Sequence, residues 1–342
     1  MVYSFELIKH ANIRYREYLP VLSCCELFAM LSSLGLNCDI AVEELGGSCF
    51  LTFECRPLSD GELSFLFGHS SVVFMAENTG GCLKPLPVSS GAYLPDDLPE
   101  VLKYKGKTGV TFTRMMINIA AALSAFRSRE MPLTFFDPLC GKGTGCFCAL
   151  TAGMNAVGLD VDKKDVKEAV DYFSRYLQFH RMKHEISRRS ETVRDHAVPV
   201  TSFRFAALRD QYQAGDVRFL SLACGDTAES PALFRNSRAH IIAADLPYGI
   251  QHAPQAGSKP EPLLHFLSRV LPAWKRTLYP GGALAVSFNT LTLPSVKVRD
   301  ALVQSGFTLP DNRLFDSLKH EVEHAVVRDV VFALNTEEES GK

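Results

Sequence analysis

The chain has 342 residues, of which 46% are hydrophobic and 22% charged, and its formal net charge at pH 7 is −2. No stretch approaches the roughly 18 uninterrupted apolar residues of a membrane helix, and the first residues lack the basic-then-apolar plan of a secretion signal. These features argue against a membrane protein and favour a globular, cytoplasmic one whose ten cysteines are reduced thiols.

Residues 1–82 predict a small domain of strands and helices. Alternating or β-rich segments predict strands at 2–10, 37–45, 48–55 and 71–77, and helical spacing predicts helices at 20–34 and 58–67. Gly46 and Gly47 suit a hairpin turn between the second and third strands. The resulting β-α-β-β-α-β order predicts a ferredoxin-like α+β domain, a common unit that does not by itself determine function.

Residues 83–105 are rich in proline and predict a semi-rigid linker, after which apolar residues at helical spacing predict a helix over 112–126. Strands and helices then alternate through residues 106–334, which predicts a mainly parallel Rossmann-like sheet covered by helices. The strands are expected at 133–137, 155–160, 218–224, 240–245, 283–289 and 326–334. The last strand follows too closely for a crossover helix, so we expect it to be antiparallel. The polar residues 335–342 predict a disordered tail.

The segment 135–145 reads FFDPLCGKGTG and joins a short apolar strand to a predicted helix. Its glycines let the main chain approach a ligand at the carboxyl end of a strand, where open α/β sheets bind nucleotides. A P-loop requires Ser or Thr after its lysine, but Gly143 follows Lys142. A dinucleotide loop prefers Gly-x-Gly-x-x-Gly, whereas this chain has Gly-x-Gly-x-Gly. The eight residues from Asp137 to Thr144 instead resemble the S-adenosylmethionine loop of Rossmann-like methyltransferases.

Two further carboxylates follow the next strands of the predicted sheet. Asp160 ends the second strand, where a carboxylate can accept both ribose hydroxyls of a nucleoside, although it could also cap the following helix, a role equally open to Asp162. Asp226 follows the third strand, where it could accept from an adenine amine or serve as an ordinary turn residue. Their common position after consecutive strands favours a ligand role for both.

The segment AADLPYG, residues 243–249, closes the fourth strand and carries the motif with the most chemistry. An aromatic amine is a poor nucleophile, and the Asp245 carboxylate with a nearby main-chain carbonyl can accept both amine protons. Tyr248 offers a ring face on which a base could stack, and Pro247 stiffens the turn. Because the nitrogen becomes cationic as it is methylated, Asp245 would stabilise developing positive charge. A structural strand-to-loop turn is the alternative.

Three other features allow a functional or a structural interpretation. Residues 175–194 contain six Lys or Arg against two Asp or Glu, which suits either phosphate contact or a solvated helix end. Thr108 and Asn118 either border the cofactor or belong to an ordinary helix and its cap. Neither His180 and His184 nor the cysteines at 140, 146 and 148 have further ligands at metal-site spacing, so we expect no metal.

Together, Asp-Pro-x-Cys-Gly-x-Gly-Thr at 137–144 and Asp-Leu-Pro-Tyr-Gly at 245–249 resemble the THUMP-related guanosine 2-amino methyltransferases of tRNA and rRNA. The resemblance covers residues 105–334, including the closing segment 314–333, and residues 18–31 are similar to the start of that group's ferredoxin-like domain. A THUMP module, which binds the acceptor end of tRNA in that group, is not evident here.

This resemblance implies a seven-stranded methyltransferase sheet, S-adenosylmethionine as cofactor, and the N2 amine of guanine in tRNA or rRNA as target. It assigns the reaction to the segment that holds Asp245, Pro247 and Tyr248. It assigns the cofactor to Asp137, Pro138, Cys140, Gly141, Gly143, Thr144, Asp160, Asp226 and Thr227.

Other functions stay compatible with the same motifs. A DNA adenine or cytosine amino-methyltransferase would need a recognition insertion, for which only residues 191–216 are available. A module that binds S-adenosylmethionine or RNA without turnover would have no use for an intact Asp-Leu-Pro-Tyr motif. A methyltransferase of small molecules or of protein glutamine could use the same catalytic loop.

Overall fold

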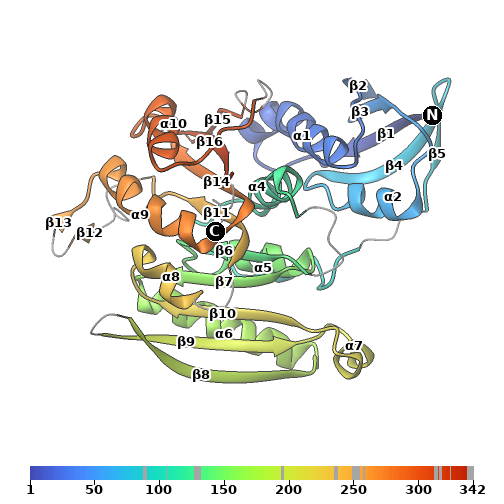
Figure 1. Cartoon of the computed structure of the whole chain (residues 1–342). Coiled ribbons are helices and arrows are strands. Elements are labelled where there is room, and N and C mark those ends of the chain that lie inside the picture. The colour runs from blue at the N-terminus through green and yellow to red at the C-terminus, as the bar shows by residue number, and fades with distance from the viewer. Residues whose placement is uncertain are drawn as a thin grey trace, which may run out of the picture.

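The structure is a computed structural model with two unequal sheets (Figure 1). The residues that it describes are 1–87, 91–104, 106–126, 132–193, 196–234, 238–248, 255–256, 259–311, 315, 318–323 and 325–336. In this part of the chain, no helix is long and apolar enough to cross a membrane.

The N-terminal domain has the predicted β-α-β-β-α-β order and adds a fifth strand. Its elements are β1 (Val2–Leu7), α1 (Ile13–Ser33), β2 (Ile40–Leu45), β3 (Ser48–Glu54), α2 (Asp60–Phe67), β4 (Val72–Thr79) and β5 (Cys82–Pro85). The strand order is β2-β3-β1-β4-β5 with antiparallel pairing throughout. Placing β1 between β3 and β4 is the arrangement of a ferredoxin-like unit.

One expectation about this part of the chain is wrong. Helix α1 begins at Ile13 and not at Pro20, because the Asn12 side chain accepts from the amides of Arg14 and Tyr15 and Pro20 is accommodated inside the helix. The expected linker 83–105 contains most of β5 and a short helix α3 (Leu98–Val101).

The second domain contains a larger number of elements, which alternate as predicted. Its helices are α4 (Val110–Leu123), α5 (Thr144–Thr151), α6 (Lys163–Phe179), α7 (Arg209–Ala214), η1 (Thr227–Glu229), α8 (Ser230–Leu233), α9 (Leu263–Thr277) and α10 (Ser295–Gln304). Its strands are β6 (Thr134–Asp137), β7 (Asn155–Asp160), β8 (His184–Val193), β9 (His196–Phe205), β10 (Arg218–Cys224), β11 (Ala239–Asp245), β14 (Leu278–Asn289), β15 (His320–Glu323) and β16 (Val326–Leu334), with a small pair β12 (Gln255–Ala256) and β13 (Lys259–Pro260).

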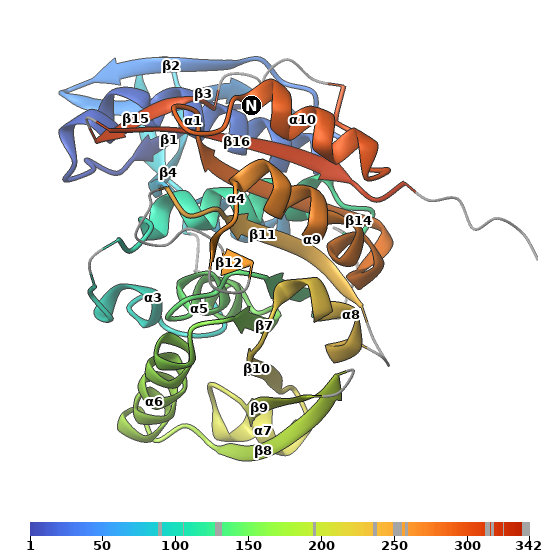
Figure 2. The same ribbon diagram turned by 90° about the vertical axis from the view of Figure 1, so that its left-hand side faces the viewer.

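The large sheet has the strand order of a Rossmann-like methyltransferase fold. Its order is β15-β16-β14-β11-β6-β7-β10-β9-β8. The strands from β10 to β14 are parallel, and β16 enters antiparallel beside β14, as predicted. The six strands predicted from the sequence and β15 make up the seven-stranded part of the sheet, and the hairpin β8–β9, which was not predicted, extends it. Figure 2 shows this hairpin at the end of the molecule remote from the N-terminal sheet.

The sheet separates two hydrophobic cores, because successive residues of a strand face opposite sides. Phe135 and Ile241 belong to the core that continues into the N-terminal domain, whereas Phe136 and Ile242 belong to the core under α9 and α10. Helix α1 packs on α4 in this shared core (Figure 1). The direction of connection reverses between β6 and β11, which places the crevice of an open α/β sheet at their carboxyl ends.

The chain remains folded beyond the predicted start of the tail. The Asn335 side chain is 1% exposed and donates to the carbonyl of Leu278 at 3.0 Å. Thr336 shares a hydroxyl hydrogen bond of 2.6 Å with Thr308. The prediction of disorder from residue 335 is therefore wrong for these two residues, while 337–342 lie outside the described residues.

Candidate active site at the carboxyl edge of the sheet

The glycine-rich loop connects the end of β6 to the start of α5. Gly141 and Gly143 have φ angles of 47° and 89°, a region that glycine adopts without strain. A Cβ added to Gly145 would lie 2.3 Å from Oδ2 of Asp137, so only glycine lets the helix start pack against that carboxyl group. The loop therefore needs glycine for two separate reasons, conformation and close approach.

Asp137 is buried below this loop at the end of β6. Its Oδ1 accepts from the amide of Leu139 at 3.2 Å. Burial raises the pKa of Asp137 to about 8, with smaller contributions from the negative charges of Asp160 and Asp245. A cationic ligand group reaching this carboxyl would compensate the buried charge.

Asp160, at the end of β7, holds the glycine loop in place. Its Oδ2 accepts from the amide of Gly141 at 2.8 Å, and its Oδ1 accepts from the amide of Asp162 at 2.9 Å. Burial raises the pKa of Asp160. The cap of α6 is Asp162, whose side chain accepts from the amides of Lys164 and Asp165. The alternative interpretation of Asp160 as the cap of the following helix is therefore wrong.

Asp226 and Thr227 follow β10 and contact helix α9. Asp226 caps η1 by accepting from the amide of Ala228 at 2.9 Å, and it also pairs with Arg269 at 2.9 Å. Thr227 is buried, and its hydroxyl accepts from the indole of Trp274 at 2.8 Å. The turn role of Asp226 is therefore present, and Arg269 is a partner that no motif indicated.

The remaining residues assigned to the cofactor loop pack tightly. Pro138 and Cys140 are buried, and a Cβ on Gly158 of β7 would lie 2.9 Å from the sulfurs of both Cys140 and Cys146. Burial raises the pKa of both thiols well above its ordinary value, so these cysteines are unreactive packing groups. Thr144 shares a hydroxyl hydrogen bond of 2.9 Å with Tyr104.

Asp245 ends β11, on the strand next to β6, and both of its carboxylate oxygens are engaged by hydroxyl groups. Tyr248 donates to Oδ1 and Thr108 donates to Oδ2. The Tyr248 hydroxyl also lies 2.9 Å from Oγ of Ser287, and the amide of Leu246 donates to the carbonyl of Ser287 at 2.8 Å. The loop that begins with Asp-Leu-Pro-Tyr is thereby fixed to β14.

Arg328, on β16, lies against the Tyr248 ring. Its guanidinium carbon lies 5.0 Å from the centre of the Tyr248 ring and 4.3 Å from that of Phe112, while the residue is only 5% exposed. Tyr248 itself keeps partial exposure. Arg328 lies in the closing segment 314–333, in which no residue was expected to have a functional role.

The other segments singled out in the sequence lie as follows. Asn118 donates to Glu26 at 2.7 Å and to the carbonyl of Gly68 at 2.9 Å, so it faces the N-terminal domain, whereas Thr108 donates to Asp245. The basic segment 175–194 forms the end of α6 and β8. Most of the residues 249–260, which follow the Asp-Leu-Pro-Tyr motif, lie outside the described residues. No group of three metal-binding side chains occurs among the residues that the structure describes.

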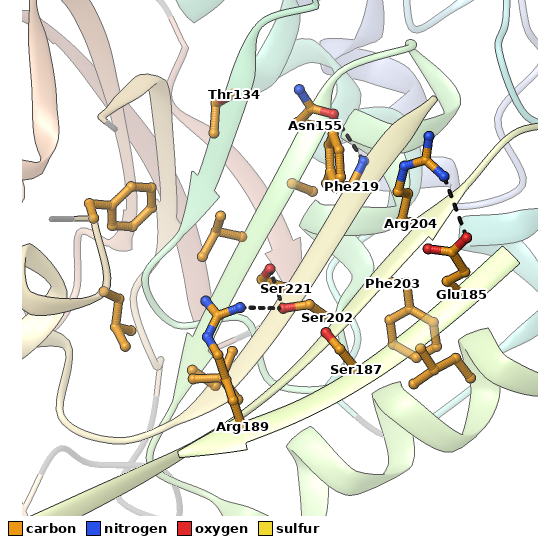
Figure 3. A pocket seen from close by; sticks show the side chains of 17 residues that line it. Thr134, Asn155, Glu185, Ser187, Arg189, Ser202, Phe203, Arg204, Phe219 and Ser221 are labelled. Carbon is orange, nitrogen blue, oxygen red and sulfur yellow. Dashed lines mark hydrogen bonds and ion pairs between the residues drawn. The ribbon is translucent and has the colours of Figure 1, made fainter. Parts of the chain in front are cut away.

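A cavity of about 590 Å³ lies apart from these motifs, on the face of the sheet formed by β6, β7, β10 and the hairpin (Figure 3). Its floor includes the cross-strand row of Ser187, Ser202 and Ser221, and Arg189 and Arg204 border it. Each arginine is paired with a glutamate of the same hairpin. None of the motif residues lines this cavity.

No family model and no curated protein matches the sequence. Solved structures that resemble the fold include TrmN from Thermus thermophilus (16% identity, TM-score 0.41, 87% of this chain and 60% of that one). Another is an rRNA methylase from Streptococcus thermophilus (12% identity, TM-score 0.37, 68% of this chain and 100% of that one). A third is magnesium protoporphyrin IX methyltransferase from Synechocystis PCC 6803 with bound SAM (12% identity, TM-score 0.39, 82% of this chain and 100% of that one). The chain thus spans only 60% of the length of the Thermus protein, and the fold class follows from the strand order itself.

Proposed function

We propose that this protein is an S-adenosylmethionine-dependent methyltransferase that acts on the exocyclic amine of a nucleobase in RNA, with N2 of guanine as the target. The observation that carries this proposal is the position of Asp245 and Tyr248 at the end of β11, directly beside the glycine loop and Asp137 at the end of β6. A base held at the first pair would face a methyl donor held at the second.

The residues around the glycine loop suit this cofactor. Asp137 offers a buried carboxyl whose pKa is raised by burial, and an ammonium group would compensate its negative charge. Gly141 and Gly143 leave main-chain groups accessible to a ligand. Asp160 fixes the loop through Gly141. When bound, the cofactor supplies a methyl carbon that is electrophilic because it is attached to a sulfonium. The protein's contribution is to orient this group and to exclude water.

Asp245 would act on the other reactant. Its oxygens accept hydrogen bonds from Thr108 and Tyr248 in this structure, which aims the carboxylate and leaves further lone pairs for the protons of an amine. As the nitrogen lone pair forms the new bond, the nitrogen becomes positively charged, and Asp245 stabilises that charge before a proton is lost. The partly exposed ring of Tyr248 supplies a stacking face for the base.

RNA is preferred over duplex DNA as the substrate. Residues 191–216, the segment available for a DNA recognition insertion, form the end of β8, strand β9 and helix α7 as part of the main sheet in the described residues. A flipped or single-stranded base satisfies the site without such an insertion.

The test is methyl transfer from labelled S-adenosylmethionine to tRNA, rRNA and DNA from cells that lack the gene. We expect 2-methylguanosine in one RNA, at least about a thousandfold less with Asp245→Ala, and wild-type transfer with Asp171→Ala, which removes an exposed carboxylate. S-adenosylhomocysteine binding should be unchanged in both variants. Label in DNA would support the DNA amino-methyltransferase. Cofactor binding without label in any nucleic acid would leave a small-molecule, protein or non-catalytic role.

A further inference from the structure

Two buried nitrogen atoms behind the catalytic motif have no hydrogen-bond partner among the described residues. They are Nε2 of His320 on β15 and Nε of Arg328 on β16. The two residues lie opposite each other in the β15–β16 register and are 1% and 5% exposed. Because an unpaired buried polar group is costly, such a pair is a candidate for contact with a ligand.

The protonation of these groups follows from their contacts. Nδ1 of His320 lies 2.8 Å from the carbonyl of Leu318, so Nδ1 carries the hydrogen and Nε2 is an acceptor. Burial lowers the pKa of His320 to about 4, which keeps the ring neutral at pH 7. Arg328 stays protonated and offers its Nε–H as a donor. The pair thus consists of one acceptor and one donor, side by side.

Both residues adjoin the site of Asp245. The Arg328 guanidinium lies over the Tyr248 ring at 5.0 Å, and Tyr248 donates to Asp245. The Phe112 ring contacts both, at 4.3 Å from the guanidinium carbon of Arg328 and 5.2 Å from the His320 ring centre. Asp245 and His320 therefore each supply a hydrogen-bond acceptor, and Arg328 supplies a donor. Each of the three adjoins the ring of Phe112, of Tyr248 or of both.

We propose that His320 and Arg328 are specificity-determining residues that bind the Watson–Crick edge of the target guanine, an inference that rests on the proposed function. Guanine presents the N2 amine as donor, N1–H as donor and O6 as acceptor, in that order. Asp245 accepts from N2, His320 Nε2 accepts from N1–H, and Arg328 Nε–H donates to O6. The N2 amine donates to an Asp245 lone pair that the hydrogen bonds from Thr108 and Tyr248 leave open.

The same arrangement disfavours the other amino bases. In adenine and in cytosine the ring nitrogen next to the amine is an acceptor, so it would face the lone pair of His320 Nε2 without a hydrogen between them. A site that leaves its own buried polar group unpaired rejects the wrong ligand strongly. Guanine preference thus depends chiefly on His320.

The test uses a synthetic oligoribonucleotide spanning the site that the wild-type protein labels, with guanosine or 2-aminopurine riboside at the labelled nucleotide. 2-Aminopurine keeps the reacting amine but lacks both N1–H and O6. We expect the wild-type protein to prefer guanosine by roughly a hundredfold in kcat/KM. His320→Phe and Arg328→Met should reduce this ratio to below about tenfold, whereas His320→Gln, which retains an acceptor, should keep most of it.

Two matched controls separate base recognition from packing. His184→Phe removes a histidine whose Nδ1 lies 2.8 Å from the carbonyl two residues earlier, as in His320, and Arg204→Met removes a guanidinium that lies 4.8 Å from the Tyr212 ring centre. Both should keep the wild-type ratio. Variants at 320 and 328 that lose rate equally on both substrates, or a wild-type protein without discrimination, would overturn the inference while leaving guanine methylation intact. Failure to label any guanine amine would instead remove the proposed function, and this inference with it.

Discussion

The two halves of the sheet's carboxyl edge hold their carboxylates in different ways. At β6 and β7, Asp137 and Asp160 accept from main-chain amides of residues at most 19 positions away in the sequence. At β11, Asp245 accepts from side-chain hydroxyls, and one of them belongs to Thr108, 137 positions away. The glycine-loop half is therefore built locally, whereas the Asp245 half is assembled from distant segments.

This difference determines how each half responds to substitution. A main-chain amide is present whatever the side chain, so the first half depends on glycine conformation and burial. The second half depends on the identity of particular side chains that only the fold brings together.

In the glycine-loop half, the largest effect is expected from Gly145→Ala. The new Cβ would lie 2.3 Å from Oδ2 of Asp137, so the carboxyl or the start of α5 must shift. We expect the affinity for S-adenosylhomocysteine, measured by titration calorimetry, to fall by at least about a hundredfold. Gly61→Ala in α2, where a Cβ would meet no atom within 4 Å, serves as the control and should bind normally.

The affinity for S-adenosylhomocysteine should depend on the ionisation of Asp137, whose pKa is about 8. If the ammonium group of the ligand requires the carboxylate, affinity should rise about fiftyfold between pH 6 and pH 8, as expected for release of one proton on binding. Asp137→Asn should bind weakly and without this slope.

Asp137 should also affect the stability of the ligand-free protein. Because the folded pKa is raised above the unfolded value, its stabilising contribution is complete below about pH 4 and is lost as pH rises through about 8. The free energy of unfolding of Asp137→Asn, measured in urea, should therefore decline less over this range than that of the wild-type protein. Equal slopes would show that this carboxyl is not buried in solution.

In the Asp245 half, Tyr248→Ala should raise the KM for RNA by roughly ten- to fiftyfold, because the stacking face is removed. Tyr248→Phe keeps that face and loses only the hydroxyl that occupies Asp245, so its KM should change by less than about fivefold. If Phe proved as damaging as Ala, the hydroxyl and not the ring face would be the important feature.

A smaller effect is expected for Thr108→Val, which removes one of the two hydroxyls that aim Asp245. We expect about a tenfold decrease in kcat with unchanged cofactor affinity, consistent with the loss of one hydrogen bond to a charged group. Thr113→Val, which removes a hydroxyl that donates to the carbonyl of Gly109 at the start of the same helix, is the matched control. Loss of cofactor affinity in Thr108→Val would contradict the independence of the two halves.

The local half was also the more predictable one from the sequence. Strands β7, β10 and β16 begin and end where the apolar patterns predicted, and the glycine loop lies where its motif placed it. The hairpin β8–β9 was missed because its alternation is masked by charged residues and Pro199, and one of its faces is polar. Arg328, His320 and Arg269 were missed because their proximity to the motifs exists only after strands far apart in the chain have paired.

Excision of the second domain along the predicted linker would disrupt the packing beside the candidate site. Glu26 of α1 is fully buried and accepts from Asn118 of α4, and the Tyr15 ring of α1 lies 5.5 Å from the His320 ring. A fragment beginning at residue 106 would leave the Asn118 amide without its Glu26 partner and would expose the His320 ring that Tyr15 covers. The N-terminal domain is therefore part of the frame that holds the candidate site, because its helix α1 shares hydrogen bonds and ring contacts with α4 and β15.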